Sequence, residues 1–344
     1  MATPTDSRPL GPIWPGRLAR LLDCPLQVAF EQGVDYQGDG TALPPALVGT
    51  AIHRCIELTF EDPTLKVGQA WSRACDEMSA SGPDPRDAAS ARRSLLRLQR
   101  KLPDLTKLIE EHQSTGDPLV EERLQSADGL FRGQPDLVLV GQPTTVVDYK
   151  SGTATTEGMV KSGYEKQLLL YAHLVADALS ADPVEAWLFS LQEGLVRVDV
   201  SPERRQEFID AARGAIRQFE EVVPGRQPGT PSDTACEWCN HAPDCDEVWT
   251  AFADGRVCDL GGGHAIEGTA IGDPMHARNG KSALSLEAER GTMTGHIMVS
   301  DLPTAVAQRF NDGQRLRATR LRQQSEEPAV LVWKNHRSRI VPIG

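Results

Sequence analysis

The sequence predicts an α/β fold of the α+β type, in which helices enclose a short run of antiparallel strands and a small, strand-rich domain follows. Two patterns lead to this prediction. Apolar residues recur at helical spacing in residues 46–60 and 86–111, and short β-branched runs occupy residues 118–150 and, again, the chain beyond residue 264. A chain of 344 residues with 40% hydrophobic content is long enough for roughly two domains.

The elements follow one another in the order helix, β-meander, helix, strands, helix. The helical pattern of residues 86–111 is interrupted by Pro103, and the strand-like runs PLVEERLQ, DLVLVGQ and TVVDYK come after it. A helix over residues 163–179, the strands EAWLFSL and LVRVDV, and a helix from Pro202 follow. A connector rich in proline and glycine then leads to CEWCNHAPDC. We expect one domain over residues 1–250, a linker over 251–264 and a β-barrel over 265–344.

Composition limits the classes of protein to be considered. The opening residues lack a basic start followed by an apolar segment, and no stretch approaches the roughly 18 apolar residues of a membrane span, so we expect a soluble, cytoplasmic protein with no membrane partner. Seven clustered cysteines favour a metal site over disulfides. The net charge of −12 argues against a generally basic surface, although residues 251–344 carry 12 Lys or Arg against 10 Asp or Glu. Any contact with nucleic acid must therefore be local.

The hairpin GQPDLVLVGQPTTVVDYK, residues 133–150, combines two carboxylates and a lysine. Asp148 and Lys150 are two residues apart, so they project from one face of a strand, and a short turn can bring Asp136 close to Asp148. Neighbouring carboxylates repel each other unless a cation lies between them, and a hard divalent ion with oxygen ligands is the usual solution. Such an ion lowers the pKa of a bound water and stabilises charge on a phosphoryl oxygen. The pattern therefore fits phosphodiester hydrolysis.

Four motifs in order resemble the RecB-like branch of the PD-(D/E)xK nuclease superfamily. They are GTAIH at residues 49–53, GQPD at 133–136, DYK at 148–150 and QLLLY at 167–171. The resemblance implies a restriction-endonuclease-like core with helical insertions. It also implies that His53, Asp136 and Asp148 bind Mg²⁺ or Mn²⁺, helped by the Tyr149 carbonyl, and that Lys150 positions the nucleophilic water.

The same resemblance assigns residues around this centre. Gln167 and Tyr171 are four apart on one helix face and correspond to the family's helix motif, which implies that they contact substrate. Glu121 resembles an upstream acidic position of the family, and Glu122 beside it leaves that assignment open.

Three cysteines, Cys236, Cys239 and Cys245, have the spacing C-x2-C-x5-C and are close enough to share one metal. Two residues are candidates for the fourth ligand: His241, which would complete a Cys3His zinc site, and Cys24, far upstream. RecB-like nucleases with an iron-sulfur cluster, such as AddB-type subunits and CRISPR adaptation nucleases, have one cysteine before the GxxxH motif and three after the core. The segment around Cys24 resembles that upstream segment, which implies a [4Fe-4S] cluster, with Zn²⁺ as the alternative.

The strands after residue 264, with one helix between the third and fourth, resemble an OB-fold, and an SH3-like barrel is the alternative. Arg315, Arg317 and Arg320 lie near one another in RLRATRLR, and Trp333 follows in WKNHRSR. Basic residues interleaved with an aromatic side chain suit phosphate contacts and base stacking, so these four are candidates for binding substrate.

The sequence thus predicts a metal-dependent deoxyribonuclease that hydrolyses single-stranded DNA or duplex ends, as an exonuclease rather than an endonuclease. The resemblance implies a role in DNA repair, recombination or antiviral defence. No G-x4-G-K-[ST] signature is present, so an unwinding helicase or a defence-complex subunit would be a separate chain. The alternative is a non-catalytic nucleic-acid-binding or assembly subunit of a helicase-nuclease or defence complex.

Overall fold

The computed structural model describes residues 10–33, 44–222, 227–237, 239–257, 260–261, 263–334 and 338–343. Its contacts divide the chain into two compact units. The core unit comprises Arg8–Ala19 and Tyr36–Glu221, and the C-terminal unit comprises Met1–Ser7, Arg20–Asp35 and Val222–Gly344. The cysteine segment is therefore grouped with the C-terminal strands, whereas the domain limits at 250 and 265 stay a prediction.

A five-stranded sheet in the order β1-β4-β5-β8-β9 forms the centre of the core unit. Its strands are β1 (Leu119–Val120), β4 (Leu137–Leu139), β5 (Thr144–Lys150), β8 (Val184–Ser190) and β9 (Gly194–Val198). Only the central pair, β5 and β8, is parallel, and helix α6 (Ser162–Leu179) makes the crossover between these two strands. The central strand β5 is rich in β-branched residues and almost wholly buried, as expected for a strand covered on both faces.

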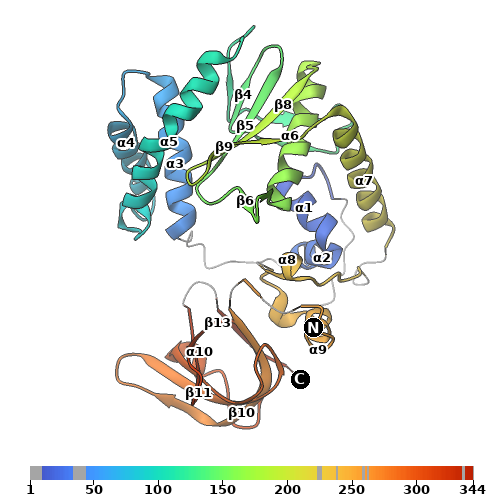
Figure 1. Ribbon diagram of the computed structural model, residues 1–344. Helices are drawn as coiled ribbons and strands as arrows, with labels where there is room; N and C mark the ends of the chain where they lie inside the picture. Colours follow the sequence, from blue (N-terminus) through green and yellow to red (C-terminus); the bar gives the residue numbers. More distant parts are fainter. Residues whose placement is uncertain are drawn as a thin grey trace. The chain divides into compact units, whose positions relative to one another are not determined.

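Helices cover both faces of this sheet (Figure 1). On one side lie α3 (Pro44–Glu61), α4 (Val67–Ser79), η1 (Pro85–Asp87) and α5 (Ala91–Glu111); on the other lie α6 and α7 (Pro202–Glu221). Leu137, Leu139, Val147 and Tyr149 pack into the core with α3, α4 and α5. Because side chains alternate along a strand, Asp148 and Lys150 project from the other face, toward α6. Two short hairpins complete the unit: β2 (Leu124–Gln125) with β3 (Arg132–Gly133), and β6 (Thr155–Thr156) with β7 (Met159–Val160).

The predicted interruption at Pro103 is wrong, because α5 continues through this residue. A proline inside a helix costs about 3 kcal/mol, whereas burying one leucine side chain stabilises by about 1.5–3 kcal/mol. Leu98, Leu102 and Leu105 are all buried on the face that packs against α3 and α4. Tertiary packing around the proline therefore outweighs the local cost.

In the C-terminal unit, short helices precede the strands. They are α2 (Pro25–Gly33), α8 (Asp233–Cys236), η2 (Ala242–Asp244) and α9 (Asp246–Ala253); α1 (Pro15–Asp23) runs across the division between the two units. The strands are β10 (His264–His276), β11 (Lys281–Gly291), β12 (Gly295–Pro303), β13 (Arg315–Ser325), β14 (Ala329–Val332) and β15 (Arg339–Pro342). Helix α10 (Thr304–Ala307) lies between β12 and β13, so the predicted set of strands with one helix in the middle is confirmed.

These strands form one sheet in the order β10-β11-β12-β14-β13-β15, and β13 also pairs with β10. The pairings therefore form a closed circuit through five strands, in which β12 and β14 are parallel and the other neighbours antiparallel. Apolar side chains from these strands and from α10 form a separate core.

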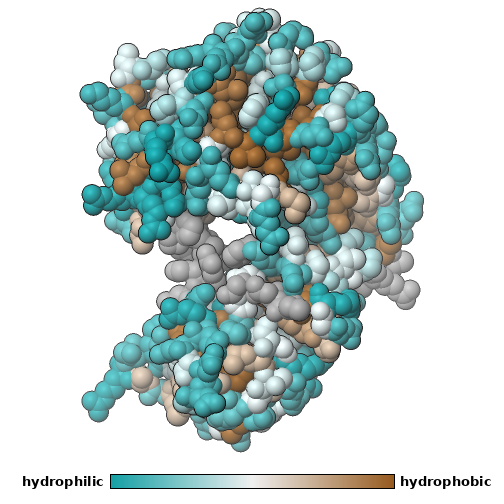
Figure 2. Space-filling model, in the orientation of Figure 1, coloured by the Kyte–Doolittle hydropathy of each residue, from teal (hydrophilic) through white to brown (hydrophobic). Residues whose placement is uncertain are grey.

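Figure 2 shows hydrophilic residues over most of the visible face, with hydrophobic residues concentrated over the sheet of the core unit. Among the described helices, none combines the length and the apolar character that crossing a membrane requires.

Candidate active site and cysteine centre

Two buried aspartates face each other where β4 and β5 pair. Leu137 is paired with Val147, so the antiparallel register places Asp136 opposite Asp148, and their residues are 6% and 2% exposed. The Tyr149 amide donates a hydrogen bond of 2.5 Å to Asp136 Oδ2, which fixes that carboxylate. Lys150 Nζ lies 2.5 Å from Asp148 Oδ2, so the two residues share one face as the strand period predicts.

His53 from α3 and Glu121 from the end of β1 join Asp136. His53 Nδ1 lies 3.2 Å from Asp136 Oδ1 and 3.8 Å from Glu121 Oε1. The Glu121 amide donates to the Asp136 carbonyl at 3.2 Å, and Gln134 Nε2 donates to Glu121 Oε2 at 2.9 Å. The ligand atoms of His53, Glu121 and Asp136 all lie within 4.8 Å of one another, a spacing suited to one divalent cation.

The pKa values of this group reflect its burial and its excess of negative charge. Burial lowers the pKa of His53, but hydrogen bonds with Asp136 and Glu121 and the nearby negative charges outweigh it and raise that pKa to about 10. Burial raises the pKa of Asp148 to about 6, with the Asp136 charge adding to the rise, although the Lys150 ammonium opposes it. At neutral pH the proton on His53 thus compensates negative charge that a metal ion would neutralise, whereas Asp148 is mostly ionised.

Helix α6 supports Lys150 from the other side of β5. Lys150 Nζ donates to Gln167 Oε1 at 3.0 Å, and Gln167 Nε2 donates to the Tyr171 hydroxyl at 3.1 Å. The Lys150 ammonium also lies 4.7 Å from the centre of the Tyr164 ring, a cation–π contact. Tyr171 is only 6% exposed, and a Cβ at Gly133 would lie 2.7 Å from its ring. The glycine of GQPD is therefore needed for close packing against the tyrosine of QLLLY.

A pocket of about 500 Å³ opens beside this group. It is lined by His53 and Glu121 together with side chains of α3, of α4 and of the turn that follows α4: Thr50, Arg54, Glu57, Glu77, Met78 and Ser81. Arg54 is held there by ion pairs of 2.7–3.0 Å with Glu57, Glu61 and Glu77. His53 and Glu121 are thus accessible from outside the protein, whereas Asp148 is buried behind them.

In the C-terminal unit, the four cysteines Cys24, Cys236, Cys239 and Cys245 line one largely apolar cavity. Backbone hydrogen bonds hold the upstream cysteine there: the Leu26 amide donates to the Pro228 carbonyl, and the Thr230 hydroxyl donates to the Asp23 carbonyl. The predicted alternative ligand, His241, stacks on Phe30 with 5.0 Å between ring centres and is not among the described residues that line the cavity. The cavity therefore brings Cys24, rather than His241, to the other three cysteines.

Three thiols of this cavity have raised pKa values and hold their protons at neutral pH. Burial raises the pKa values of Cys236, Cys239 and Cys245 to about 11. Because metals bind thiolates, loading this cavity would release protons. The other two described cysteines, Cys55 and Cys75, are buried in the core of the core unit.

The remaining candidate substrate residues are distributed over the C-terminal strands. Arg315 is exposed and pairs with Glu267 and Glu289 at 2.9 and 3.1 Å. Arg317 and Arg320 are only 6% and 5% exposed and make contacts inside the unit, so binding DNA through them would require those contacts to break. Trp333 is half-buried against the apolar core of these strands.

A family model described as "PD-(D/E)XK nuclease superfamily" matches residues 14–246, about two thirds of the chain. This chain belongs to the PD-(D/E)XK nuclease superfamily. Members of the superfamily are usually metal-dependent nucleases that use Mg²⁺ or Mn²⁺ and act on nucleic acid, and the His53, Glu121 and Asp136 group is a candidate metal site of that kind.

Two further comparisons add nothing to this assignment. The solved structure titled "Crystal structure of SSO0001" is similar at 14% identity and a TM-score of 0.31, over 68% of this chain and 86% of that one. No curated protein matches the chain. The family assignment therefore depends on the family model.

Sequence reasoning left one PD-(D/E)XK site residue open and missed another. Glu121, not Glu122, belongs to the group that could hold a metal, because a left-handed backbone conformation at Glu121 (φ 52°) ends β1 there. Tyr164 was not singled out, although it lies three residues before Gln167 and one helical turn therefore carries both to Lys150.

Proposed function

We propose that this chain is a RecB-like, metal-dependent deoxyribonuclease that hydrolyses single-stranded DNA or duplex ends. The observation that carries the proposal is the convergence of Asp136, Asp148 and Lys150 from β4 and β5 with His53 from α3. Three carboxylates, including Glu121, surround this point, and Lys150 and a protonated His53 balance only two of them. A divalent cation is the chemical group that such an excess of negative charge favours.

Each residue has a role that its contacts support. His53, Asp136, Asp148 and the Tyr149 carbonyl would hold Mg²⁺ or Mn²⁺, and Glu121 would be a further ligand. The bound ion would supply a water of lowered pKa and stabilise charge on the phosphoryl oxygen.

The remaining groups position Lys150 and the substrate. Lys150 would orient the attacking water, held in place by Asp148 and Gln167. Gln167 and Tyr171 would support Lys150 from α6, with Gln167 near enough to reach the substrate.

The biological setting is proposed from the RecB-like resemblance. We infer exonuclease rather than endonuclease activity, in DNA repair, recombination or antiviral defence, and in the cytoplasm. A separate helicase or defence-complex subunit would supply unwinding.

The cysteine cavity would hold a [4Fe-4S] cluster bound by Cys24, Cys236, Cys239 and Cys245. All four cysteines line one cavity that His241 does not line, which supports a centre bound by four thiolates rather than by three thiolates and His241. The preference for this cluster over zinc comes from the RecB-like resemblance, and the role of the cluster would be structural.

The C-terminal strands would form an OB-like barrel. Their closed circuit of pairings, the parallel pair β12 and β14, and α10 between the third and fourth strands support this assignment. A barrel of this type would bring single-stranded DNA, or a partner protein, to the nuclease.

The test is cleavage of end-labelled single- and double-stranded DNA by anaerobically purified protein with Mn²⁺, Mg²⁺ or EDTA. Asp148→Ala and Lys150→Ala should abolish cutting. Lys107→Ala, which removes an exposed lysine of α5, is the matched control and should cut like the wild type.

The alternative, a non-catalytic binding or assembly subunit, gives a different result. It should bind DNA equally well with EDTA and in the Asp148→Ala variant, and it should not cut. A folded wild type that binds Mn²⁺ but cuts none of these substrates would overturn the nuclease proposal for the isolated chain.

A further inference from the structure

Two arginines of β13 point toward the cysteine segment because the strand contains a β-bulge. His264 is paired with Leu321 but Ile266 with Ala318, so one extra residue is accommodated on β13. Arg320 there has φ of +57°, a conformation that non-glycine residues rarely adopt. The bulge changes which residues share a face: Leu316, Ala318 and Leu321 point into the core of the strands, whereas Arg317 and Arg320 both point away from it.

Arg320 binds backbone carbonyls of the cysteine segment. Its Nη2 donates to the Cys239 carbonyl at 2.9 Å and to the Glu237 carbonyl at 3.2 Å, and its Nε donates to Glu237 at 3.3 Å. These carbonyls lie within the stretch that carries Cys236 and Cys239. Hydrogen bonds from a charged donor are stronger than neutral ones, so this guanidinium restrains the backbone at Glu237 and at Cys239.

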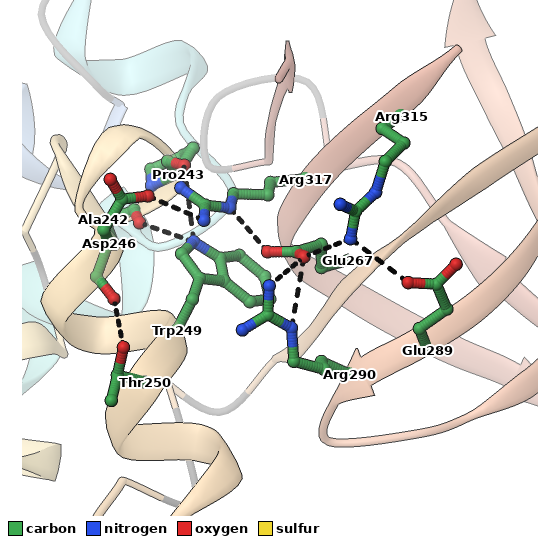
Figure 3. A network of polar contacts seen from close by, with 10 residues as sticks. All are labelled: Ala242, Pro243, Asp246, Trp249, Thr250, Glu267, Glu289, Arg290, Arg315 and Arg317. Atoms are coloured by element: carbon green, nitrogen blue, oxygen red, sulfur yellow. Dashed lines mark hydrogen bonds and ion pairs between the residues drawn. The ribbon is translucent and has the colours of Figure 1, made fainter. Parts of the chain in front are cut away.

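Arg317 holds the next part of the same segment (Figure 3). Its guanidinium pairs with Asp246 at 2.8 Å, donates to the Pro243 carbonyl at 3.3 Å and lies 5.2 Å from the centre of the Trp249 ring. Its Nε donates to Glu267 Oε2 at 2.8 Å. Arg317 thus connects β10 and β13 to the residues on either side of Cys245.

We propose that Arg320 is a positioning residue of the cysteine centre, and that the C-terminal strands hold the three downstream cysteines at the spacing their metal needs. This inference rests on the proposed metal cluster. It assigns the buried β13 arginines to that centre rather than to DNA. Mutation of a residue that orients metal ligands without binding the metal itself typically lowers metal affinity by about 10–100-fold.

The experiment compares Arg320→Gln, Arg320→Lys and Arg322→Gln in the full-length, anaerobically purified protein. Arg322 is exposed on the same strand, which makes Arg322→Gln the matched control. Iron and acid-labile sulfide per chain are measured, together with the rate at which a chelator removes the absorption near about 400 nm. We expect about 10–100-fold faster loss in Arg320→Gln, an intermediate rate in Arg320→Lys, and the wild-type rate in Arg322→Gln.

A second measurement, on metal-free protein, keeps this inference separate from the identity of the cluster. Hydrogen exchange of the backbone amides in residues 236–246 should be about 10-fold faster in Arg320→Gln than in Arg322→Gln, because the carbonyls lose their charged donor. Exchange in β5 should stay unchanged. Arg320→Lys keeps the charge and most of the volume, so it decides the matter if Arg320→Gln does not fold.

The outcomes are distinguishable. Equal exchange in residues 236–246 and equal cluster lifetimes in the Arg320 and Arg322 variants would overturn the role of Arg320. A wild type without iron and sulfide would overturn the [4Fe-4S] proposal, and the exchange comparison would still decide the role of Arg320.

Discussion

The two units each contain a group of charges that includes at least one buried carboxylate, and the groups differ in balance. In the C-terminal unit, three carboxylates (Glu267, Glu289 and Asp246) meet three arginines (Arg290, Arg315 and Arg317). In the core unit, three carboxylates (Glu121, Asp136 and Asp148) meet one lysine, Lys150, with His53 as a second cation only when it is protonated. The first group is neutral by itself, whereas the second carries an excess of negative charge.

The pKa values follow this difference. Burial raises the pKa of Glu267, but hydrogen bonds from Arg317 and Arg290 outweigh it and hold that pKa below its usual value. The pKa of Asp148, which has one cationic partner, is raised. A balanced buried network stabilises the fold, and an unbalanced one that opens on a pocket through His53 and Glu121 is suited to binding a cation.

The largest effect that tests this comparison is loss of the Glu267 charge. Glu267→Gln should lower the free energy of unfolding by about 3–5 kcal/mol, because it removes the fully buried carboxylate that Arg290, Arg315 and Arg317 share and leaves the buried Arg317 only the exposed Asp246 as an acidic partner. Thermal and urea unfolding, followed by circular dichroism, measure this loss. It should be confined to the transition of the C-terminal unit.

Glu289→Gln is the matched control. Glu289 is half-exposed and pairs with the exposed Arg315, so its loss should change stability by no more than about 1 kcal/mol. Equal losses in the two variants would mean that the network is a set of surface pairs rather than a buried, balanced group.

A smaller effect of opposite sign is expected at Asp148. Its pKa is about 6 in the folded protein and about 3.9 in an unfolded chain, so the folded protein binds this proton more tightly. The ionised carboxylate therefore costs stability above pH 6, and that cost disappears as the pH falls from about 6 to 4. Asp148→Asn should stabilise the metal-free protein at pH 7 by on the order of 1–3 kcal/mol, since one pKa unit corresponds to about 1.4 kcal/mol.

Thermal unfolding with EDTA at pH 7 and pH 4 measures this gain. The variant should be more stable than the wild type at pH 7 and equal to it at pH 4, and Mn²⁺ should stabilise the wild type more than the variant. Destabilisation at both pH values would show that the Asp148 and Lys150 pair supports the fold in the way the Glu267 network does.

The core sheet and its motifs could be predicted because they depend on local patterns. The β-branched run of β5 and the two-residue period placed Asp148 and Lys150 on one face, and the structure has them in contact. The two-residue period does not describe Arg317 and Arg320. Strict alternation would place these two side chains on opposite faces of β13, whereas both point away from the core of the strands. A bulge removes that alternation, and the partners of both arginines include backbone carbonyls 74 to 83 residues away, which no local pattern reveals.

The sequence could not decide between Glu121 and Glu122 for a similar reason, because the backbone conformation that distinguishes them depends on a distant part of the chain. Adjacent residues at a strand end differ only in backbone direction, and the left-handed turn at Glu121 is set by pairing with the chain around Asp136. The cysteine ligands were easier to predict, since the number and spacing of the cysteines limit which of them can share one metal. The cavity that brings Cys24 to the other three cysteines depends on contacts between segments far apart in the sequence.

The smallest predicted effect tests the charge count of the active site directly. Glu121→Gln removes one of the three carboxylates and should weaken Mn²⁺ binding by about 10-fold, because Glu121 Oε1 lies with His53 Nδ1 and an Asp136 oxygen inside one metal-sized space. Glu122→Gln, an equal change of charge at the adjacent exposed residue, should bind Mn²⁺ like the wild type. Calorimetric titration of both variants separates a ligand from a general electrostatic effect, since equal weakening in the two would mean that charge alone, and not the geometry at Glu121, attracts the ion.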